Sequence, residues 1–129
     1  MKKFLFLTFF LFPLMMANAQ VDLLFCTSME SLENCQESEA TFPWVGNTTS
    51  LKVMVINKDS LKTDRVKFKL YIVKPNGTED MFAELFLTTK QEWLYASKTI
   101  FFMQPGYYKV MAYNNKDELL TTGFVKLTP

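Results

Sequence analysis

The sequence predicts an all-β protein, built as a single antiparallel β-sandwich of about seven strands. Short apolar segments recur from Thr41 to the end of the chain at intervals of roughly 8–14 residues. Several alternate between apolar and polar positions, which is the period of a strand with one buried face. Clusters of Gly, Pro and Asn separate these segments, and no stretch keeps a helical period over three turns. An antiparallel sandwich accounts for all three observations.

The clearest strand covers residues 66–72, where apolar side chains alternate with lysine and tyrosine. Residues 51–55 alternate in the same way, and a further strand is expected near Thr41. The sequence Pro75-Asn76-Gly77 predicts a hairpin turn, because Asn-Gly accepts the positive φ angles of a tight turn. These signals place an antiparallel pair around residue 76.

The second half of the chain supplies the other strands. Residues 99–103 are apolar after Thr99, as expected of a strand buried on both faces. Residues 79–87 could form a short helix with acidic residues at its start, but the β-branched and aromatic content elsewhere favours a strand. A hairpin loop is expected at residues 114–117, and Gly123 is a candidate bulge. The strands expected here cover residues 81–87, 99–103, 107–113 and 119–127.

The first nineteen residues have the pattern of an export signal. Lys2 and Lys3 precede an apolar run over residues 4–16, which is too short to cross a membrane. Ala17-Asn18-Ala19 supplies the small residues that precede a cleavage site, so we expect cleavage before Gln20. We therefore expect an exported protein, periplasmic or secreted, with no membrane span after cleavage.

The mature chain is expected to divide near Trp44. Residues 20–44 form an acidic N-terminal segment that contains both cysteines, Cys26 and Cys35, and residues 45–129 form the sandwich domain. An oxidising compartment and an even cysteine count favour a structural disulfide between the two.

Composition excludes several classes of function. The chain contains no histidine, which excludes Ser-His-Asp and Cys-His catalysis and every His-ligated metal site. Without residues 1–19, twelve basic residues face thirteen acidic ones, and this balance is unlike that of a nucleic-acid-binding protein. Adjacent carboxylates at Glu79-Asp80 and Asp117-Glu118 point to opposite faces of a strand, so neither pair forms an obvious acid–base dyad. We expect no metal, no cofactor and no catalytic residue.

The segment from Phe102 to Val110 resembles the E–F corner of immunoglobulin-like domains, where a Gly precedes a Tyr by two residues. Gly106 and Tyr108 match that spacing, so the resemblance implies that the Tyr108 hydroxyl bonds back to upstream backbone. Val110 stands where antibody domains place their second core cysteine, so the intersheet disulfide is missing. The resemblance covers about residues 40–129. It is to immunoglobulin-like or fibronectin-III-like modules, as in small uncharacterised exported bacterial proteins, and it implies a fold without an activity.

Alternation along two strands predicts a binding face. If Tyr108 points inward, every second residue from Tyr107 to Tyr113 points outward. The outward residues of the strand at 66–72 join them when the two strands lie side by side. Phe124 and Lys126 would extend this face. Tyrosine is a favoured contact residue, and lysines suit an acidic protein or an anionic glycan, although ordinary cross-strand pairing would give the same pattern. The predicted face consists of Lys67, Lys69, Tyr71, Tyr107, Lys109 and Tyr113.

Three classes of function remain open. The leading hypothesis is an exported, non-enzymatic binding or interaction module, whose partner is an envelope or extracellular protein or a glycan. Such a module should expose one aromatic-rich patch. The alternative is a structural or assembly component of an envelope complex, which should expose a sheet edge suited to strand addition. A carboxylate- or Ser-Lys-based enzyme is the third class, and it should show a pocket with convergent carboxylates.

Overall fold

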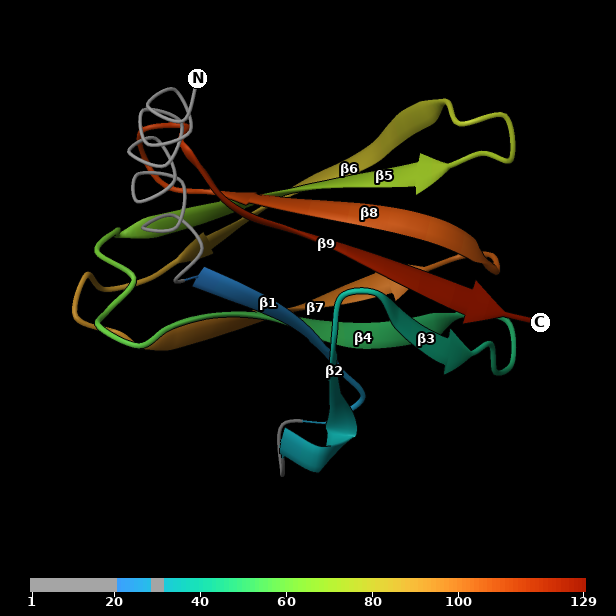
Figure 1. Cartoon of the computed structure of the whole chain (residues 1–129), viewed down its shortest axis with the longest axis horizontal. Coiled ribbons are helices and arrows are strands. Elements are labelled where there is room, and N and C mark those ends of the chain that lie inside the picture. Colours follow the sequence, from blue (N-terminus) through green and yellow to red (C-terminus); the bar gives the residue numbers. More distant parts are fainter. Residues whose placement is uncertain (1–20, 29–31) are drawn as a thin grey trace, which may run out of the picture.

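The computed structural model describes residues 21–28 and 32–129, so the predicted signal peptide lies outside the described residues. Nine strands and one short 3-10 helix make up the described chain (Figure 1). The elements are β1 (Val21–Cys26), η1 (Leu32–Asn34), β2 (Cys35–Glu37), β3 (Ala40–Pro43), β4 (Thr49–Asn57), β5 (Arg65–Val73), β6 (Glu79–Thr88), β7 (Tyr95–Phe102), β8 (Gly106–Tyr113) and β9 (Leu119–Thr128).

The strands form two sheets that pack face to face. One has the order β2-β1-β4-β7 and the other the order β3-β9-β8-β5-β6. Strand pairs are antiparallel, except that β3 runs parallel to β9. The chain is an immunoglobulin-like β-sandwich, and all seven predicted strands are present. The two strands beyond the predicted seven, β1 and β2, come from residues 20–44, and β3 from the same segment joins the other sheet.

Strand alternation builds the core. On β5 and β8 every second side chain is buried against the opposite sheet, and β1 contributes Leu23 and Phe25 from the other side. Gly123 lies on β9 directly beneath these two side chains. A Cβ atom built there would lie 2.7 Å from Leu23 Cδ2 and 3.1 Å from Phe25 Cε2. The close approach of β1, rather than the predicted bulge, therefore explains why position 123 is a glycine. The register shift in this strand pair lies between Ala112 and Tyr113.

Two local predictions are corrected by the structure. The strand expected at residues 99–103 begins earlier, at Tyr95, and it is not buried on both faces. It is an edge strand with one face toward solvent, so Phe101 is 64% exposed and Met103, just beyond it, is 73% exposed. The helical alternative for residues 79–87 is wrong, since these residues belong to β6. The hydrogen bonds that pair this segment with β5 outweigh the helical preference of acidic residues at its start.

Turns and crosslinks fix the ends of the strands. Residues 74–78 form the predicted hairpin turn, in which the Gly77 N–H donates to the Lys74 carbonyl at 2.8 Å and Gly77 has a φ of 90°. Cys26 and Cys35 form a disulfide that joins β1 to β2, with an S–S distance of 2.07 Å. Among the described residues, no helix is long and apolar enough to cross a membrane.

The E–F corner contains the hydrogen bond that the resemblance implies. The Tyr108 hydroxyl donates to the Gln104 carbonyl oxygen at 2.6 Å, and the Tyr108 side chain is almost fully buried. Its ring packs against Phe102 with centroids 4.7 Å apart. Burial raises the pKa of the Tyr108 hydroxyl. The hydroxyl therefore ties the loop before β8 to the core.

Candidate functional site

The six residues of the predicted Tyr/Lys face lie together on the outer surface of one sheet. Strands β5 and β8 are neighbours, and their register sets Lys67 opposite Tyr113 and Tyr71 opposite Lys109. The side chains between them along each strand are buried, so alternation places this set on the outside. The Tyr/Lys face is formed by Lys67, Lys69, Tyr71, Tyr107, Lys109 and Tyr113.

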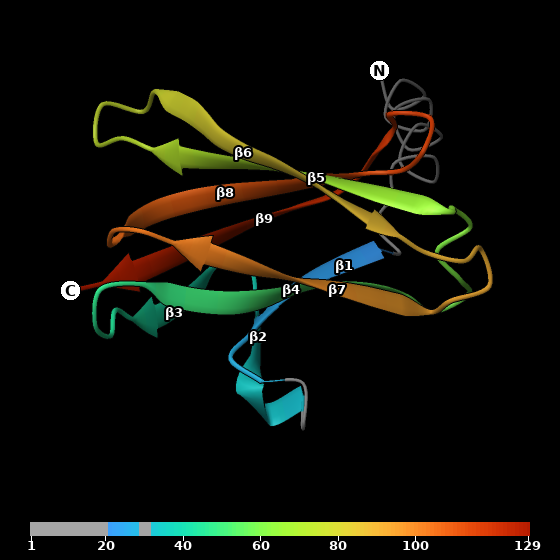
Figure 2. The ribbon, with the colours of Figure 1, turned by 180° about the vertical axis from the view of Figure 1, so that it is seen from behind.

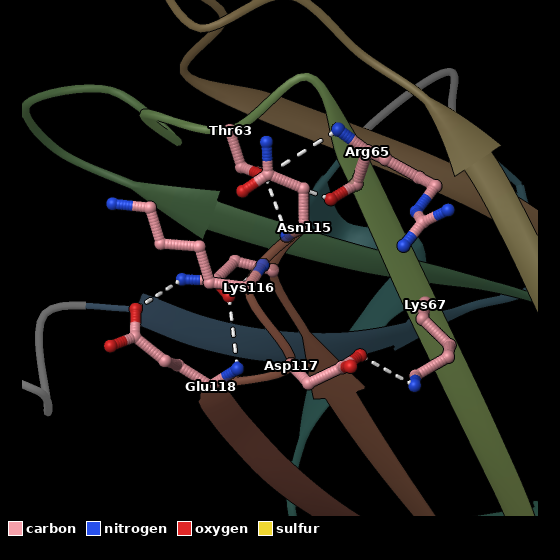
Figure 3. A network of polar contacts seen from close by, with 8 residues as sticks. Thr63, Arg65, Lys67, Asn115, Lys116, Asp117 and Glu118 are labelled. Atoms are coloured by element: carbon pink, nitrogen blue, oxygen red, sulfur yellow. Dashed lines mark hydrogen bonds and ion pairs between the residues drawn. The ribbon is translucent and has the colours of Figure 1, made fainter.

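Neighbouring carboxylates neutralise two of its lysines. Lys67 Nζ lies 2.7 Å from Asp117 Oδ1 (Figure 3), and Lys109 Nζ lies 2.5 Å from Glu79 Oε1. The hydrogen bond to Asp117 raises the pKa of Lys67, and the same contact lowers the pKa of Asp117. These charges are therefore largely satisfied within the fold.

The lysines also pack over aromatic rings of the same face. Lys109 Nζ lies 5.0 Å from the ring centroid of Tyr71, and Lys69 Nζ lies 5.1 Å from that of Tyr113. Such cation–π contacts are typical of cross-strand neighbours on a sheet surface. The pattern therefore matches internal cross-strand pairing, the alternative weighed for this face.

The acidic N-terminal segment covers one end of the face. The Tyr107 hydroxyl donates to Glu39 Oε2 at 2.5 Å, and this hydrogen bond raises the pKa of Tyr107 to about 12. The Tyr107 ring stacks on Phe124 with centroids 5.7 Å apart, and Lys126 is its register partner. Tyr107 is therefore held between β9 and the segment before β3.

The β8–β9 loop is a locked hairpin. The Asn115 N–H donates to Thr63 Oγ1 at 3.0 Å (Figure 3), and Asn114 Oδ1 accepts from the Glu118 N–H at 2.9 Å. Asp117 pairs with Lys67, whereas Glu118 accepts from Asn114 Nδ2. The two carboxylates therefore have separate partners and do not form a dyad. No cluster of metal-ligating side chains occurs in residues 21–28 and 32–129.

Exposed apolar side chains gather elsewhere, on the side of the sandwich where β6 and β7 form the free edges of the two sheets (Figure 2). We call this the open side. Eight of the ten large apolar side chains exposed in the described chain lie on β6, on β7 or next to them. Met81 and Phe86 are the register partners of Tyr71 and Lys67 and point to the outer face of their sheet. The other six line two hollows on the open side, and they are Phe82, Trp93, Leu94, Tyr95, Phe101 and Met103.

A hollow of about 540 Å³ lies at the loop end of the open side. We call it the Trp93 hollow. Its lining is mostly apolar and consists of Leu87, Thr88, Trp93, Leu94, Tyr95, Ala96 and Ser97. The β6–β7 loop that presents Trp93 is anchored by backbone hydrogen bonds to the last residue of β4 and to the β4–β5 connection. Leu61 N–H donates to the Trp93 carbonyl at 2.7 Å, and Asn57 N–H donates to the Leu94 carbonyl at 2.8 Å. The exposed tryptophan therefore stands on a fixed backbone.

A second hollow, of about 220 Å³, lies at the other end of the open side. We call it the Phe82 hollow, and it is lined by Ile72, Phe82, Phe101, Met103, Gln104 and Tyr108. A register shift in the β5–β6 pair explains why Phe82 points there, since Ala83 pairs with Leu70 while Met81 pairs with Tyr71. The unpaired Phe82 turns inward, and its ring lies 5.5 Å from that of Tyr108.

One lysine points into the open side between the two hollows. Lys98 is the β7 register partner of Val53, whose side chain is fully buried, so both side chains share the inner face of their sheet. Within the described part of the chain Lys98 forms no ion pair. It is therefore a free cation flanked by apolar surface.

The sequence contained a signal for the open side that pattern analysis did not use. Trp93, Leu94 and Tyr95 are three consecutive large apolar residues in a segment with no strand period. Three consecutive apolar residues are expected in a buried strand. Next to the polar turn residues Gln91-Glu92, they indicate exposed apolar surface.

Comparisons with known proteins find similarity only among solved structures. No protein-family model matches the chain, and no curated protein is significantly similar to it. An immunoglobulin-like protein of Pseudomonas aeruginosa superposes with a TM-score of 0.45 at 13% identity, covering 83% of this chain and 90% of that one. A CARDB domain from Pyrococcus furiosus, solved with two metal ions, gives 0.44 at 14% identity, covering 84% and 92%. A β-glucosidase of Thermotoga neapolitana gives 0.44 at 10% identity, but only 16% of its chain is covered.

Proposed function

We propose that this protein is an exported, non-enzymatic interaction module that binds an apolar segment of a partner protein through its open side. The observation that carries the proposal is that six exposed apolar side chains line the two hollows of the open side. Scattered apolar residues are normal on a protein surface, whereas exposed apolar side chains that line a hollow mark an interaction site. The fixed backbone of the β6–β7 loop supports it, because a preorganised aromatic loses little freedom on binding.

The same geometry argues against an enzyme. Neither hollow on the open side is lined by a carboxylate, and the two adjacent carboxylate pairs have separate partners or lie on opposite faces of a strand. Proton transfer needs acid and base groups that converge on one site. The open side offers apolar contact and one ammonium group instead.

Assembly by strand addition is also less well supported. Strand β6 carries a register shift at Phe82, and β7 carries the inward-pointing Lys98. Bulges and inward charges are devices by which natural sheets keep their edges from pairing with other strands. We therefore propose docking through side chains, and a disulfide-linked chain of this kind suits an oxidising, exported setting.

Paired variants test this proposal. The double variant Trp93→Ser, Leu94→Ser removes exposed apolar surface from the open side, and Val45→Ser, Leu119→Ser removes exposed apolar surface elsewhere as a matched control. A third variant, Tyr71→Ala with Tyr113→Ala, tests the Tyr/Lys face. Proteins captured from an envelope extract of the source organism are identified by mass spectrometry for each.

We expect the open-side variant to lose partners that the wild-type protein and both other variants retain. Circular dichroism and urea denaturation establish that each variant is folded. Loss of the same partners in the Tyr71→Ala, Tyr113→Ala variant alone would move the site to the Tyr/Lys face. Equal capture by all folded variants would show that neither the open side nor the Tyr/Lys face binds the partner.

A further inference from the structure

We propose that the partner segment is an extended peptide in which an acidic residue lies midway between two apolar residues. Its apolar side chains occupy the Trp93 hollow and the Phe82 hollow, and its carboxylate pairs with Lys98. This inference rests on the proposed function and adds the chemistry of the occupant.

Spacing along β7 sets the pattern of the peptide. Ser97 lines the Trp93 hollow and Phe101 lines the Phe82 hollow, four residues apart on a strand that pairs with β4 without a register shift. These are the lining residues of the two hollows that lie nearest to each other on β7, so at about 3.3 Å per residue the near ends of the hollows are about 13 Å apart along the strand. In an extended peptide, side chains at positions i, i+2 and i+4 point the same way and span the same length. Apolar residues at i and i+4 therefore have the shortest spacing that reaches both hollows.

Charge determines the residue between them. Lys98 lies between Ser97 and Phe101 along β7, and its side chain points to the inner face of the sheet, as does Ala96 of the Trp93 hollow. It has no carboxylate partner within residues 21–28 and 32–129. Other charges near the open side are placed differently. Glu84 lies opposite Lys69 on the outer face, and Glu92 lies in the exposed β6–β7 turn. A residue at position i+2 lies level with Thr99, one residue from Lys98 and within reach of its long side chain, which favours Asp or Glu and disfavours Lys or Arg.

The hollows also limit the size of the apolar side chains. The Trp93 hollow, at about 540 Å³, accepts a large side chain such as Phe or Trp with room to spare. The Phe82 hollow, at about 220 Å³, suits a Leu or Met. The inferred motif is therefore aromatic, any residue, acidic, any residue, aliphatic, in one chain direction or the other.

Synthetic peptides test the inference directly. The probe is a fluorescein-labelled peptide in which phenylalanine, glutamate and leucine alternate with threonine, made in both sequence directions. A second pair carries lysine in place of glutamate. Fluorescence anisotropy measures binding to the wild-type mature chain, to Lys98→Glu, and to Lys52→Glu. Lys52 lies on the outer face of the same sheet, next to Thr99, so its reversal changes the net charge equally without touching the open side.

We expect the glutamate peptide to bind wild type and Lys52→Glu at least about threefold more tightly than the lysine peptide. Lys98→Glu should reverse that preference. Equal affinity for the two peptides, or a preference that Lys98→Glu leaves unchanged, would overturn the inference, as would no binding by any peptide at millimolar concentration. Partner capture that still depends on Trp93 in these cases would leave the proposed function standing. Loss of dependence on Trp93 would refute the proposed function itself.

Discussion

Replacing Tyr108 with phenylalanine removes one oxygen atom and leaves the rest of the E–F corner in place. The ring contacts with Phe102 and Phe82 do not involve the hydroxyl, so they persist. What disappears is the 2.6 Å hydrogen bond to the Gln104 carbonyl. The substitution therefore isolates the contribution of a single hydrogen bond at the start of β8.

The size of the effect follows from burial. A typical intramolecular hydrogen bond contributes about 0.5–1.5 kcal/mol net, and leaving a buried carbonyl without a partner costs about 1–3 kcal/mol. Tyr108 is 3% exposed, but Gln104 lies in an exposed loop, so water can solvate its carbonyl after a small shift. We therefore expect a loss of about 1–1.5 kcal/mol in the free energy of unfolding. For a domain of this size, that loss lowers Tm by about 4–8 °C.

Urea denaturation of the mature chain at neutral pH measures the change, with thermal unfolding as a second readout. Tyr95→Phe is the control, because Tyr95 is 54% exposed and its hydroxyl has no hydrogen-bond partner within the described chain. Its unfolding midpoint should match wild type. An unchanged midpoint in Tyr108→Phe would refute the reasoning, since it would mean that the hydroxyl does not stabilise the corner.

Three further predictions concern stability. Gly123→Ala should cost about 1–3 kcal/mol in urea denaturation, because the added methyl group overpacks the core beneath β1; an unaltered midpoint would contradict this close packing. Replacing Cys26 and Cys35 by alanine should cost about 2–3 kcal/mol, the loop-closure value for a crosslink of nine residues' separation, and thiol labelling of unreduced protein should find no free thiol. Tyr107 has a folded-state pKa of about 12, above its ordinary value near 10, because of its hydrogen bond to Glu39. The unfolded chain then loses this proton first, so stability should fall as pH rises from 10 to 12, and Tyr107→Phe should show a shallower fall across that range.

The strands with one solvent-facing side could be predicted from the sequence. Alternation over residues 66–72 and 107–113 placed buried and outward side chains correctly, because period 2 is a property of the strand itself. Residues 99–103 were predicted to be buried on both faces, because four successive apolar residues carry no period. Whether such a strand is central or at an edge depends on which strands pair with it, and that is decided by residues far away in the chain.

The candidate site was harder to predict for the same reason. Alternation identified the Tyr/Lys face, but not that Asp117 and Glu79 lie close enough to neutralise its lysines. Those contacts depend on the register between strands and on the conformation of the β8–β9 hairpin. The open side was not predicted at all, because it exists only where the edges of two sheets meet. Trp93 and Phe82 are close in sequence, but they line hollows at opposite ends of the open side, and no local period indicates either hollow.

The mode of docking can be separated from strand addition by one change to the peptide. If the partner bound by extending β6 or β7, its backbone N–H groups would supply the affinity, and methylation of alternate amide nitrogens would abolish binding. The register shift at Phe82 and the inward Lys98 oppose such a ladder, whereas the two hollows accept side chains. Alternate N–H groups of a strand point to opposite sides, so two glutamate peptides are needed, one N-methylated at its threonine positions and one at the residues between them. We expect each to bind within about threefold of the unmodified peptide, a difference of under about 0.7 kcal/mol. Anisotropy titrations compare the unmodified peptide with both methylated peptides against wild-type protein. A loss of more than tenfold on methylation of either set would show that backbone hydrogen bonds carry the interaction, and it would make the assembly alternative the better account of the open side.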